Sequence, residues 1–395
     1  MKIIYPHPMI FPNTMAHSIQ VTNTCWEMAS QGVEVILIVR KIEKGSIREG
    51  LKVYGLCEQK NLTISGSKKK TRRIAYYVSV IKEIRRQRKN GNVVIFLRDK
   101  QLTRLLLFLK RLLKTPLFFE SHGVAYLVLQ DKIKRAKINI TLTDWCRNKI
   151  KVWKYFRLER FIYQKVDGII YQTAGIEQEI RKRFHISAPV KVIYSATRMT
   201  ARKPKSDCKK ILYLGQLYPQ KGTDILIQSL QYLPGRKLII IGGNKKEDVL
   251  RIQKLCDRIG VKDRVVITGH VEPWELENYF GQIGVGVIPI LDVLETQLFT
   301  SPLKLFDYMA AKIPIVASNL PSIREVLSDG ETGILVEPNN PKKLAEGIEK
   351  ILSEPALAKK ISEQAYQKAK NYTWEKRAEN ILTFIKGYKS TMDRQ

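Results

Sequence analysis

The stretch over residues 299–318 combines a small polar turn, a short helix that carries an acid and a buried strand. A Thr-Ser-Pro turn at 300–302 leads into an apolar-spaced helix over 303–311, and a strand is predicted over 313–317. A loop that enters a helix gathers unpaired backbone N–H groups at the positive end of the helix dipole, which suits a phosphate. Asp307 lies one turn further in, where its carboxylate can accept hydrogen bonds from a ribose. An ordinary loop-helix-strand unit with a solvated acid fits the same spacing.

A second phosphate-binding pattern follows the apolar run at 211–214. Gly215 opens a loop that ends in Lys221 and Gly222. Glycine allows the backbone to approach a phosphate closely, and a lysine supplies a mobile cation. A solvated lysine in a turn is the alternative interpretation of this loop.

Composition and length restrict the class of protein. A chain of 395 residues with 44% hydrophobic residues is expected to form two packed domains. No stretch reaches the roughly 18 apolar residues that would cross a bilayer, and the N-terminus does not resemble a secretory signal. The five cysteines are scattered without a C-x-x-C pair, which is typical of isolated thiols in a reducing compartment. These features predict a cytoplasmic protein.

The positive charge is concentrated in the first half of the chain. Residues 1–200 contain 39 Lys and Arg against 14 Asp and Glu, an excess of 25, whereas the remaining residues contain 30 against 23, an excess of 7. This asymmetry predicts an anionic partner for the first half, which could be a membrane surface, an acidic acceptor or a nucleic acid. Basic segments at 68–73 and 85–89 and a cation-rimmed apolar helix at 102–114 either dock on an anionic bilayer or are solvated faces of core-packing helices. The membrane-binding candidates are Lys68, Lys69, Lys70, Arg72 and Arg73.

Strand-like runs alternate with helical segments in two series, as in doubly wound α/β sheets. The first series is Ile3–Tyr5, Val33–Val39, Val93–Leu97, Leu117–Glu120, Ile138–Leu142 and Gly168–Tyr171. The second series is Ile211–Leu214, Leu238–Ile241, Val265–Thr268, Val285–Ile288, Ile313–Ala317 and Ile334–Val336. A polar, basic stretch at 199–209 separates them and is interpreted as an interdomain linker.

The segment FTSPLKLFDYMAAKIPIVAS resembles the donor-site signature of family 4 retaining glycosyltransferases of the GT-B fold. The similarity continues through PSIREVL at 321–327 and GETGILV at 330–336 and ends near residue 374; the N-terminal half matches loosely. The resemblance implies an α/β, GT-B architecture in which two Rossmann-like doubly wound domains face a central cleft. We therefore predict an acceptor-side domain over 1–198, the linker over 199–209, a nucleotide-sugar donor domain over 210–375, and a helix over 376–395 that packs back toward the first domain.

The resemblance also implies a function. It predicts transfer of a sugar, with retention of configuration, from a nucleotide diphosphate sugar to an acceptor. We expect the acceptor to be a lipid-linked or membrane-associated glycan, as in the biosynthesis of a cell-surface polysaccharide or glycolipid. The enzyme would then be peripheral on the inner face of the cytoplasmic membrane.

The family motifs assign roles to individual residues. Lys221 matches a cation on the donor diphosphate, and His122 lies where the family often places a histidine that faces the donor sugar; these are the predicted catalytic residues. The donor-binding candidates are Gly215, Gln216, Lys221, Gly242, Gly243, His270, Thr300, Ser301, Pro302, Leu303, Lys304 and Asp307. The acceptor-side candidates are His17, Arg98 and Glu120, although Arg98 and its neighbour Asp99 equally suggest an ordinary salt bridge.

Three departures from the family pattern motivate an alternative. Gln216 replaces an arginine, Phe299 occupies the position of the first of two acids with Glu295 one turn away, and the loop before His17 lacks glycines. A relative that binds a nucleotide sugar or a partner enzyme without turnover is therefore the second hypothesis. No D-x-D, H-E-x-x-H or clustered His/Cys/carboxylate set occurs in the sequence, so we expect no metal or other cofactor. Nucleic-acid binding would rest on charge alone and is not favoured.

Overall fold

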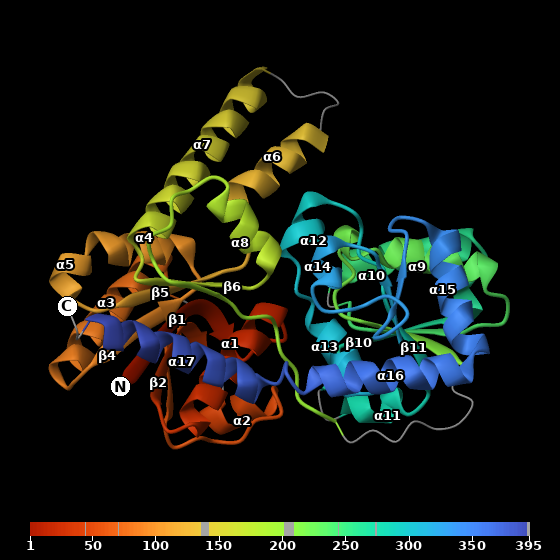
Figure 1. Ribbon diagram of the computed structural model, residues 1–395, viewed down its shortest axis with the longest axis horizontal. Helices are drawn as coiled ribbons and strands as arrows, with labels where there is room; N and C mark the ends of the chain where they lie inside the picture. Colours follow the sequence, from red (N-terminus) through yellow and green to blue (C-terminus); the bar gives the residue numbers. More distant parts are fainter. Residues whose placement is uncertain are drawn as a thin grey trace. The chain divides into compact units, whose positions relative to one another are not determined.

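The computed structural model describes residues 1–43, 45–69, 71–135, 142–200, 209–243, 245–272 and 275–392 (Figure 1). The chain divides into two compact units. Unit 1 comprises Met1–Tyr194 and Trp374–Gln395, and unit 2 comprises Ser195–Thr373. Each unit is a parallel sheet with helices, which confirms the predicted doubly wound fold class.

Unit 1 contains seven parallel strands in the order β3-β2-β1-β4-β5-β6-β7. The strands are β1 (Lys2–Phe11), β2 (Glu34–Ile42), β3 (Leu62–Ser65), β4 (Val93–Leu97), β5 (Leu117–Ser121), β6 (Gly168–Tyr171) and β7 (Val190–Val192). The helices are α1 (Ala16–Ser30), α2 (Ile47–Lys52), α3 (Arg73–Lys89), α4 (Lys100–Phe108), α5 (Lys110–Leu113), α6 (Ala125–Arg135), α7 (Leu142–Lys165), α8 (Ala174–Arg181) and α17 (Trp374–Met392). The strand order reverses between β1 and β4, and the carboxyl ends of strands at such a switch point are where open α/β sheets bind ligands.

Unit 2 contains six parallel strands in the order β10-β9-β8-β11-β12-β13. The strands are β8 (Lys210–Leu214), β9 (Leu238–Ile241), β10 (Val265–Gly269), β11 (Ile283–Ile288), β12 (Ile315–Ser318) and β13 (Ile334–Val336). The helices are α9 (Thr223–Ser229), α10 (Lys246–Arg258), α11 (Leu276–Phe280), α12 (Leu294–Phe299), α13 (Leu303–Ala310), α14 (Pro321–Arg324), α15 (Pro341–Ser353) and α16 (Pro355–Ala369), with 3-10 turns η1 (Pro219–Lys221), η2 (Leu230–Tyr232) and η3 (Lys262–Arg264). The switch point of this sheet lies between β8 and β11.

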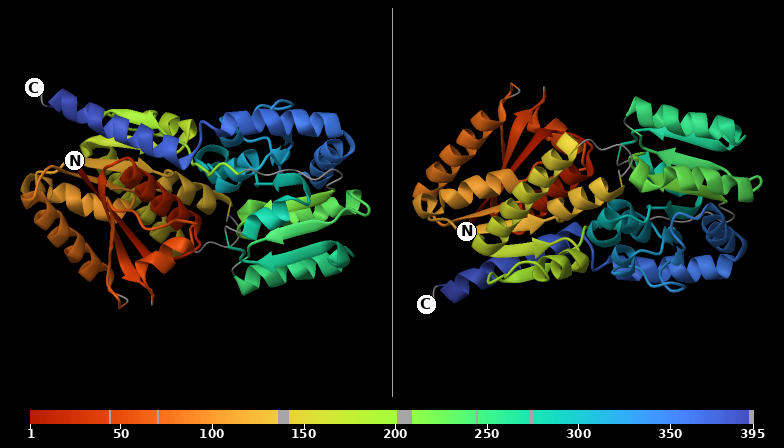
Figure 2. Two further views of the ribbon diagram at one scale, coloured as in Figure 1. Left: turned by 90° about the horizontal axis from the view of Figure 1, so that it is seen from below. Right: turned by 90° about the horizontal axis from the view of Figure 1, so that it is seen from above.

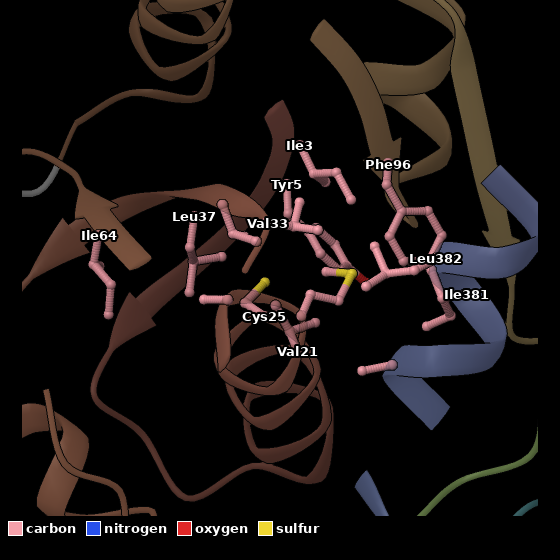
Figure 3. Packing of buried hydrophobic residues seen from close by; sticks show 14 of the residues in the cluster. Ile3, Tyr5, Val21, Cys25, Val33, Leu37, Ile64, Phe96, Ile381 and Leu382 are labelled. Carbon is pink, nitrogen blue, oxygen red and sulfur yellow. The ribbon is translucent and has the colours of Figure 1, made fainter. Parts of the chain in front are cut away.

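The last helix belongs to the core of unit 1, as Figures 1 and 2 show for α17 in blue. Its residues Ala378, Ile381, Leu382 and Ile385 recur at helical spacing and are buried. In Figure 3 the side chains of Ile381 and Leu382 lie in one cluster with those of β1, β2, β4 and α1. Because burying an aliphatic side chain contributes about 1.5–3 kcal/mol, this stripe fastens the end of the chain to the first sheet.

Several elements differ from the prediction. The apolar run at 102–114 forms two helices, α4 and α5, that meet at Leu109. Leu142, predicted to end a strand, begins α7, and residues 136–141 lie outside the described part of the chain. The short strands β3 and β7 were not predicted. The units divide after Tyr194, whereas we predicted a boundary at 198, and most of the predicted linker, residues 201–208, lies outside the described residues.

Candidate functional site

Two lysines of unit 2 lie near each other at the end of β8. Lys304 is in the first turn of α13, and its ammonium nitrogen lies 3.5 Å from the centroid of the Tyr213 ring. Among the described residues this buried nitrogen has no hydrogen-bond partner. Burial, and then the charge of Lys221, hold the pKa of Lys304 well below its usual range. Burial also lowers the pKa of Lys221, while the charge of Glu295 raises it. An anion bound here would stabilise both charged ammonium groups.

Glycines let the loops around these lysines pack closely. Gly222 has φ +71°, and a Cβ there would lie 1.6 Å from the carbonyl oxygen of Pro289, which follows β11. Gly242 has φ +130°, and a Cβ there would lie 2.2 Å from the carbonyl oxygen of Gly215. A side chain at either position would force these loops apart. The loops after β8, β9 and β11 therefore converge at the switch point of the sheet, where the sequence predicted phosphate contacts.

The start of α13 supplies a helix N-terminus beside Lys304. Pro302 is the residue before the helix and no side chain caps it. Two hydrogen bonds from Ser195 hold the turn that precedes the helix. The Ser195 amide donates to Ser301 Oγ over 3.1 Å, and Ser195 Oγ donates to the Ser301 carbonyl over 2.8 Å. Its first turn therefore presents backbone N–H groups and the positive end of the dipole to an anion. The predicted donor-binding residues of this turn are Thr300, Ser301, Pro302, Leu303 and Lys304.

Asp307 lies on the next turn of α13, and one of its carboxylate oxygens accepts a hydrogen bond from a neighbouring side chain. Thr197 Oγ1 donates to Asp307 Oδ1 over 2.7 Å. Burial raises the pKa of Asp307 to about 6, although the Thr197 hydrogen bond acts in the opposite direction. Thr200 Oγ1 also donates to the Ala310 carbonyl over 3.0 Å, so residues 195–200 bind α13 and belong to unit 2. A ribose contact through Asp307 stays a prediction.

The remaining donor-binding candidates occupy the neighbouring loops. The Tyr213 hydroxyl donates to the Gln216 backbone carbonyl over 2.7 Å, which fixes the backbone of this loop. His270 follows β10 and is 40% exposed, with Nε2 3.7 Å from Glu272 Oε1. Gly243 has φ +86° beside Gly242. These positions border the same strand ends as Lys221.

The polar candidates of unit 1 lie in a buried network around Glu120, whose charge is compensated inside the protein. The carboxylate of Glu120, 1% exposed, forms an ion pair with Arg377 of α17 and accepts from the Tyr5 hydroxyl over 3.0 Å. Arg377 also donates to the carbonyls of Ile193 and Tyr194 over 3.0 and 2.7 Å. Burial would raise the pKa of Glu120, but Arg377, His122 and Arg98 together outweigh it and hold that pKa well below its usual range. Glu120 therefore has no exposed surface for the acceptor contact that we predicted.

His122 is positioned by this network. Its Nδ1 donates to Gln172 Oε1 over 2.5 Å, and its Nε2 lies 3.3 Å from Glu120 Oε1. Burial and the charge of Arg98 lower the pKa of His122 to about 4, although Glu120 acts in the opposite direction. The imidazole is therefore neutral at pH 7. Arg98 Nη1 donates to the side-chain amide oxygen Oε1 of Gln20 over 2.9 Å, and Asp99 pairs with Arg73 instead.

His7 and Arg377 are members of this cluster that sequence reasoning missed. His7 lies on β1 with its ring 5.2 Å from that of His17, and neither nitrogen has a hydrogen-bond partner among the described residues. Burial and the charges of Arg98, His17 and His122 lower its pKa well below the usual value. A histidine within an apolar strand carries no sequence signal. Arg377 pairs with a residue 257 positions away, which no local pattern could reveal.

The predicted basic surface is exposed in part. Lys68, Lys69 and Arg72 are exposed, whereas Lys70 lies outside the described residues. Arg73 is 3.3 Å from the Asp99 carboxylate and stacks on the Tyr77 ring at 5.5 Å, so its charge is partly compensated. No helix within the described ranges is long and apolar enough to cross a membrane. In the same ranges no group of three or more His, Cys, Asp or Glu side chains is arranged to hold a metal ion.

Comparisons with known families cover nearly the whole chain. Residues 18–198 match the family model described as Glycosyltransferase Family 4, and residues 197–368 match that described as Glycosyl transferases group 1. The chain belongs to the GT4-type glycosyltransferases. The predicted family is thereby confirmed, and the family is one of transferases.

The curated relatives of this glycosyltransferase are distant. An uncharacterized glycosyltransferase, MJ1607 of Methanocaldococcus jannaschii, is 30% identical over 46% of this chain and 46% of its own length. Alpha-D-kanosaminyltransferase of Streptomyces kanamyceticus is 24% identical over 65% and 66%, respectively. Glycogen synthase of Mycobacterium tuberculosis is 27% identical over 55% and 53%. The chain thus spans about half to two thirds of the length of these relatives.

Solved structures place the glycosyltransferase in the GT-B fold. Sucrose-phosphate synthase from Thermosynechococcus elongatus matches with a TM-score of 0.77 and 17% identity, covering 99% of this chain and all of that one. WaaG, a glycosyltransferase involved in lipopolysaccharide biosynthesis, matches with a TM-score of 0.68 and 14% identity over 96% and 98%. HepE from Anabaena, solved with UDP and glucose, matches with a TM-score of 0.71 and 13% identity over 98% and 100%. At these identities the likeness shows the fold.

The structure shows the surroundings of one residue, Phe299, at which this glycosyltransferase departs from its family. Phe299, at the position where the family usually has its first acid, is 5% exposed and lies at the end of α12. An apolar side chain there packs into unit 2 and cannot bind a sugar hydroxyl. Sugar contacts on this side would have to come from the α13 turn or from Glu295.

Proposed function

We propose that this chain transfers a sugar from a nucleotide diphosphate sugar to an acceptor, with retention of configuration. The observation that carries the proposal is the lysine pair of unit 2, in which the buried Lys304 ammonium has no hydrogen-bond partner among the described residues and lies near Lys221. Lysine charges of this kind are stabilised by an anionic ligand, and a diphosphate supplies more than one negative oxygen. HepE, which was solved with UDP and with UDP-glucose, supports this class of donor.

The chemistry follows from where charge develops. In sugar transfer the bond to the diphosphate breaks, so negative charge builds on the leaving phosphate oxygen. Lys304 is held against Tyr213 and the helix N-terminus of α13 is fixed by Ser195, so both are preorganised toward that charge. Groups that need no rearrangement during the reaction stabilise the transition state most effectively. We keep the prediction that transfer needs no metal, because these groups supply positive charge at the diphosphate.

We further propose that the acceptor is a membrane-associated glycan. The excess of 25 positive charges in residues 1–200 against 7 in the rest of the chain supports an anionic surface as partner of unit 1. The exposed Lys68, Lys69 and Arg72 agree with that reading. The corresponding location of the enzyme is the inner face of the cytoplasmic membrane, where it would bind as a peripheral protein.

The test is release of nucleoside diphosphate. The purified chain is incubated with uridine, guanosine and adenosine diphosphate sugars, with and without a bacterial lipid extract as acceptor source. Release from one donor that is stimulated by lipid is expected, and Lys221→Ala should lose it, whereas the exposed Lys342→Ala in the same unit should not. Donor binding without release, even with lipid extract, would favour the non-catalytic alternative. Absence of both binding and release would overturn the proposal.

A further inference from the structure

Helices α6 and α7 form an antiparallel pair that extends from the sheet of unit 1 (Figure 1). The pair is anchored where it leaves the sheet. The Glu159 carboxylate of α7 accepts from the backbone amides of Ala125 and Tyr126 over 2.8 and 3.2 Å, and it also binds Lys100. The Tyr126 ring packs on Phe156 at 5.2 Å. We call residues 125–135 and 142–165 the α6–α7 hairpin. These contacts fix the base of the hairpin to the rest of unit 1.

The outer part of the hairpin exposes aromatic and aliphatic side chains. Trp145 is 44% exposed, Ile150 53% and Trp153 55%. Of the tryptophans that the structure describes, these two are the exposed ones. A groove of about 640 Å³ runs between the helices and is lined by aromatic side chains together with Lys134 and Lys149. Isolated exposed apolar residues are ordinary, but a cluster of this kind on one element marks an interaction surface.

Positive charge surrounds the aromatic side chains. Residues 125–135 and 142–157 contain eight Lys and Arg against two Asp. Both acids are engaged locally, since Asp131 binds Arg135 and Asp144 lies 3.6 Å from Arg147. Lys149 Nζ lies 3.8 Å from the centroid of the Trp145 ring. Arg157 stacks similarly over Trp153 at 4.8 Å.

The combination of exposed tryptophans and cations indicates which kind of partner binds this surface. Tryptophan is enriched at the headgroup level of membranes, where its ring is amphipathic, and cations near an anionic leaflet are attracted to it. A second copy of this chain would bring a formal charge of +32 against the same cations, so self-association through this face is disfavoured. Anionic lipid complements both the charge and the apolar surface.

We propose that the α6–α7 hairpin docks the enzyme on an anionic bilayer by inserting Trp145 and Trp153 at the headgroup level. The inference deepens the proposed function and rests on it for the biological role, since a membrane-borne acceptor requires such contact. It assigns the docking to an element other than the basic segment 68–73, which the sequence pointed to.

The experiment is co-sedimentation of the full chain with vesicles. The vesicles are phosphatidylcholine alone, or phosphatidylcholine mixed with an equal amount of phosphatidylglycerol, each at low and high salt. Wild-type protein should sediment with the anionic vesicles at low salt and be released by high salt. Brominated acyl chains in those vesicles should quench its tryptophan fluorescence.

Three sets of variants locate the contact. Lys134→Gln, Lys149→Gln and Arg157→Gln together should weaken vesicle binding on the order of 10²-fold, since these cations line the groove or lie over a tryptophan ring and each cation at such a surface contributes about fivefold. The matched control removes the exposed Lys342, Lys359 and Lys360 of unit 2 and should leave binding unchanged. Trp145→Ala with Trp153→Ala should abolish both binding and quenching, whereas Tyr232→Ala with Leu250→Ala, equally exposed in unit 2, should not.

Two outcomes would overturn the proposal. One is equal recovery in the supernatant with neutral and anionic vesicles at low salt. The other is loss of binding in Lys68→Gln, Lys69→Gln, Arg72→Gln while the hairpin variants still bind, which would assign docking to the basic segment. Thermal unfolding of each variant shows that it is folded. Nucleoside diphosphate binding by the hairpin variants tests the donor site separately, so failure of docking and failure of the proposed function are distinguishable.

Discussion

The lysine pair of unit 2 and the Glu120 network of unit 1 differ in how a buried charge is compensated. In unit 1, Arg377 neutralises Glu120, and hydrogen bonds to Tyr5 and backbone carbonyls complete the network. In unit 2, Lys304 is buried beside another lysine, with a tyrosine ring as its neighbour instead of a carboxylate. In the first arrangement the buried charge of Glu120 is compensated without a ligand. In the second arrangement the Tyr213 ring is the neighbour of the Lys304 ammonium, and a bound anion would stabilise it further, as the proposed diphosphate site requires.

The largest effect should come from breaking the completed network. Arg377→Met leaves the buried Glu120 carboxylate without its ion-pair partner, so the free energy of unfolding of unit 1 should fall by about 3–5 kcal/mol. Urea denaturation followed by circular dichroism measures it. Arg86→Met, which removes an exposed pair with Glu83, is the control and should change stability little. If Arg377→Met were as stable as wild type, the carboxylate would not depend on this partner.

Removing a cation from the lysine pair of unit 2 should lower turnover without lowering stability. Lys304→Met should reduce turnover by about 10²-fold or more, as loss of a preorganised charge-stabilising group does. Ligand-free stability should be unchanged or higher, because one of two neighbouring buried cations is gone. Donor turnover and thermal unfolding are measured on the same preparation. A variant that turns over normally would remove Lys304 from the mechanism.

The two regions should also respond to pH with opposite sign. The pKa of His122 falls from 6.5 to about 4 on folding, so the unfolded chain binds more protons between these values and His122 makes stability rise with pH there. The pKa of Asp307 rises from 3.8 to about 6, so the folded chain binds more protons and Asp307 makes stability fall as pH increases across that range. Urea unfolding between pH 4 and 6.5 measures both. His122→Asn should make the rise smaller, since His7 and His17 contribute a rise of the same sign, and Asp307→Asn should remove the contribution of Asp307 to the fall. An unchanged pH slope in either variant would contradict its assignment.

The smallest effect should come from adding charge. Gln216→Arg restores the cation that the family usually has on this loop, and a partly exposed pair contributes only about 0.2–1 kcal/mol. Nucleoside diphosphate affinity, measured by calorimetry, should improve severalfold or stay the same. A marked loss of affinity would mean that the loop after β8 does not face the phosphates.

Local patterns in the sequence predicted the elements that carry local chemistry. The sequence pointed to the Thr300–Lys304 turn, the glycines after β8 and β9, and Lys221 because helix starts and strand-to-loop glycines have short-range signatures; their contacts with a donor stay a prediction. The Glu120–Arg377 pair was not, because it joins β5 to a helix at the other end of the chain. The two exposed tryptophans of α7 were missed for a related reason: helical spacing alone does not tell which face a neighbouring helix covers.

The most direct test is a thermal shift with nucleoside diphosphates on wild-type protein and Lys304→Met. A ligand at about 100 times its Kd adds roughly 2.7 kcal/mol to stability. At least one of uridine, guanosine or adenosine diphosphate should raise the melting temperature of the wild type, and the same concentration should have little effect on Lys304→Met. No shift with any nucleoside diphosphate, or an equal shift in both proteins, would contradict the assignment of the lysine pair as the donor diphosphate site.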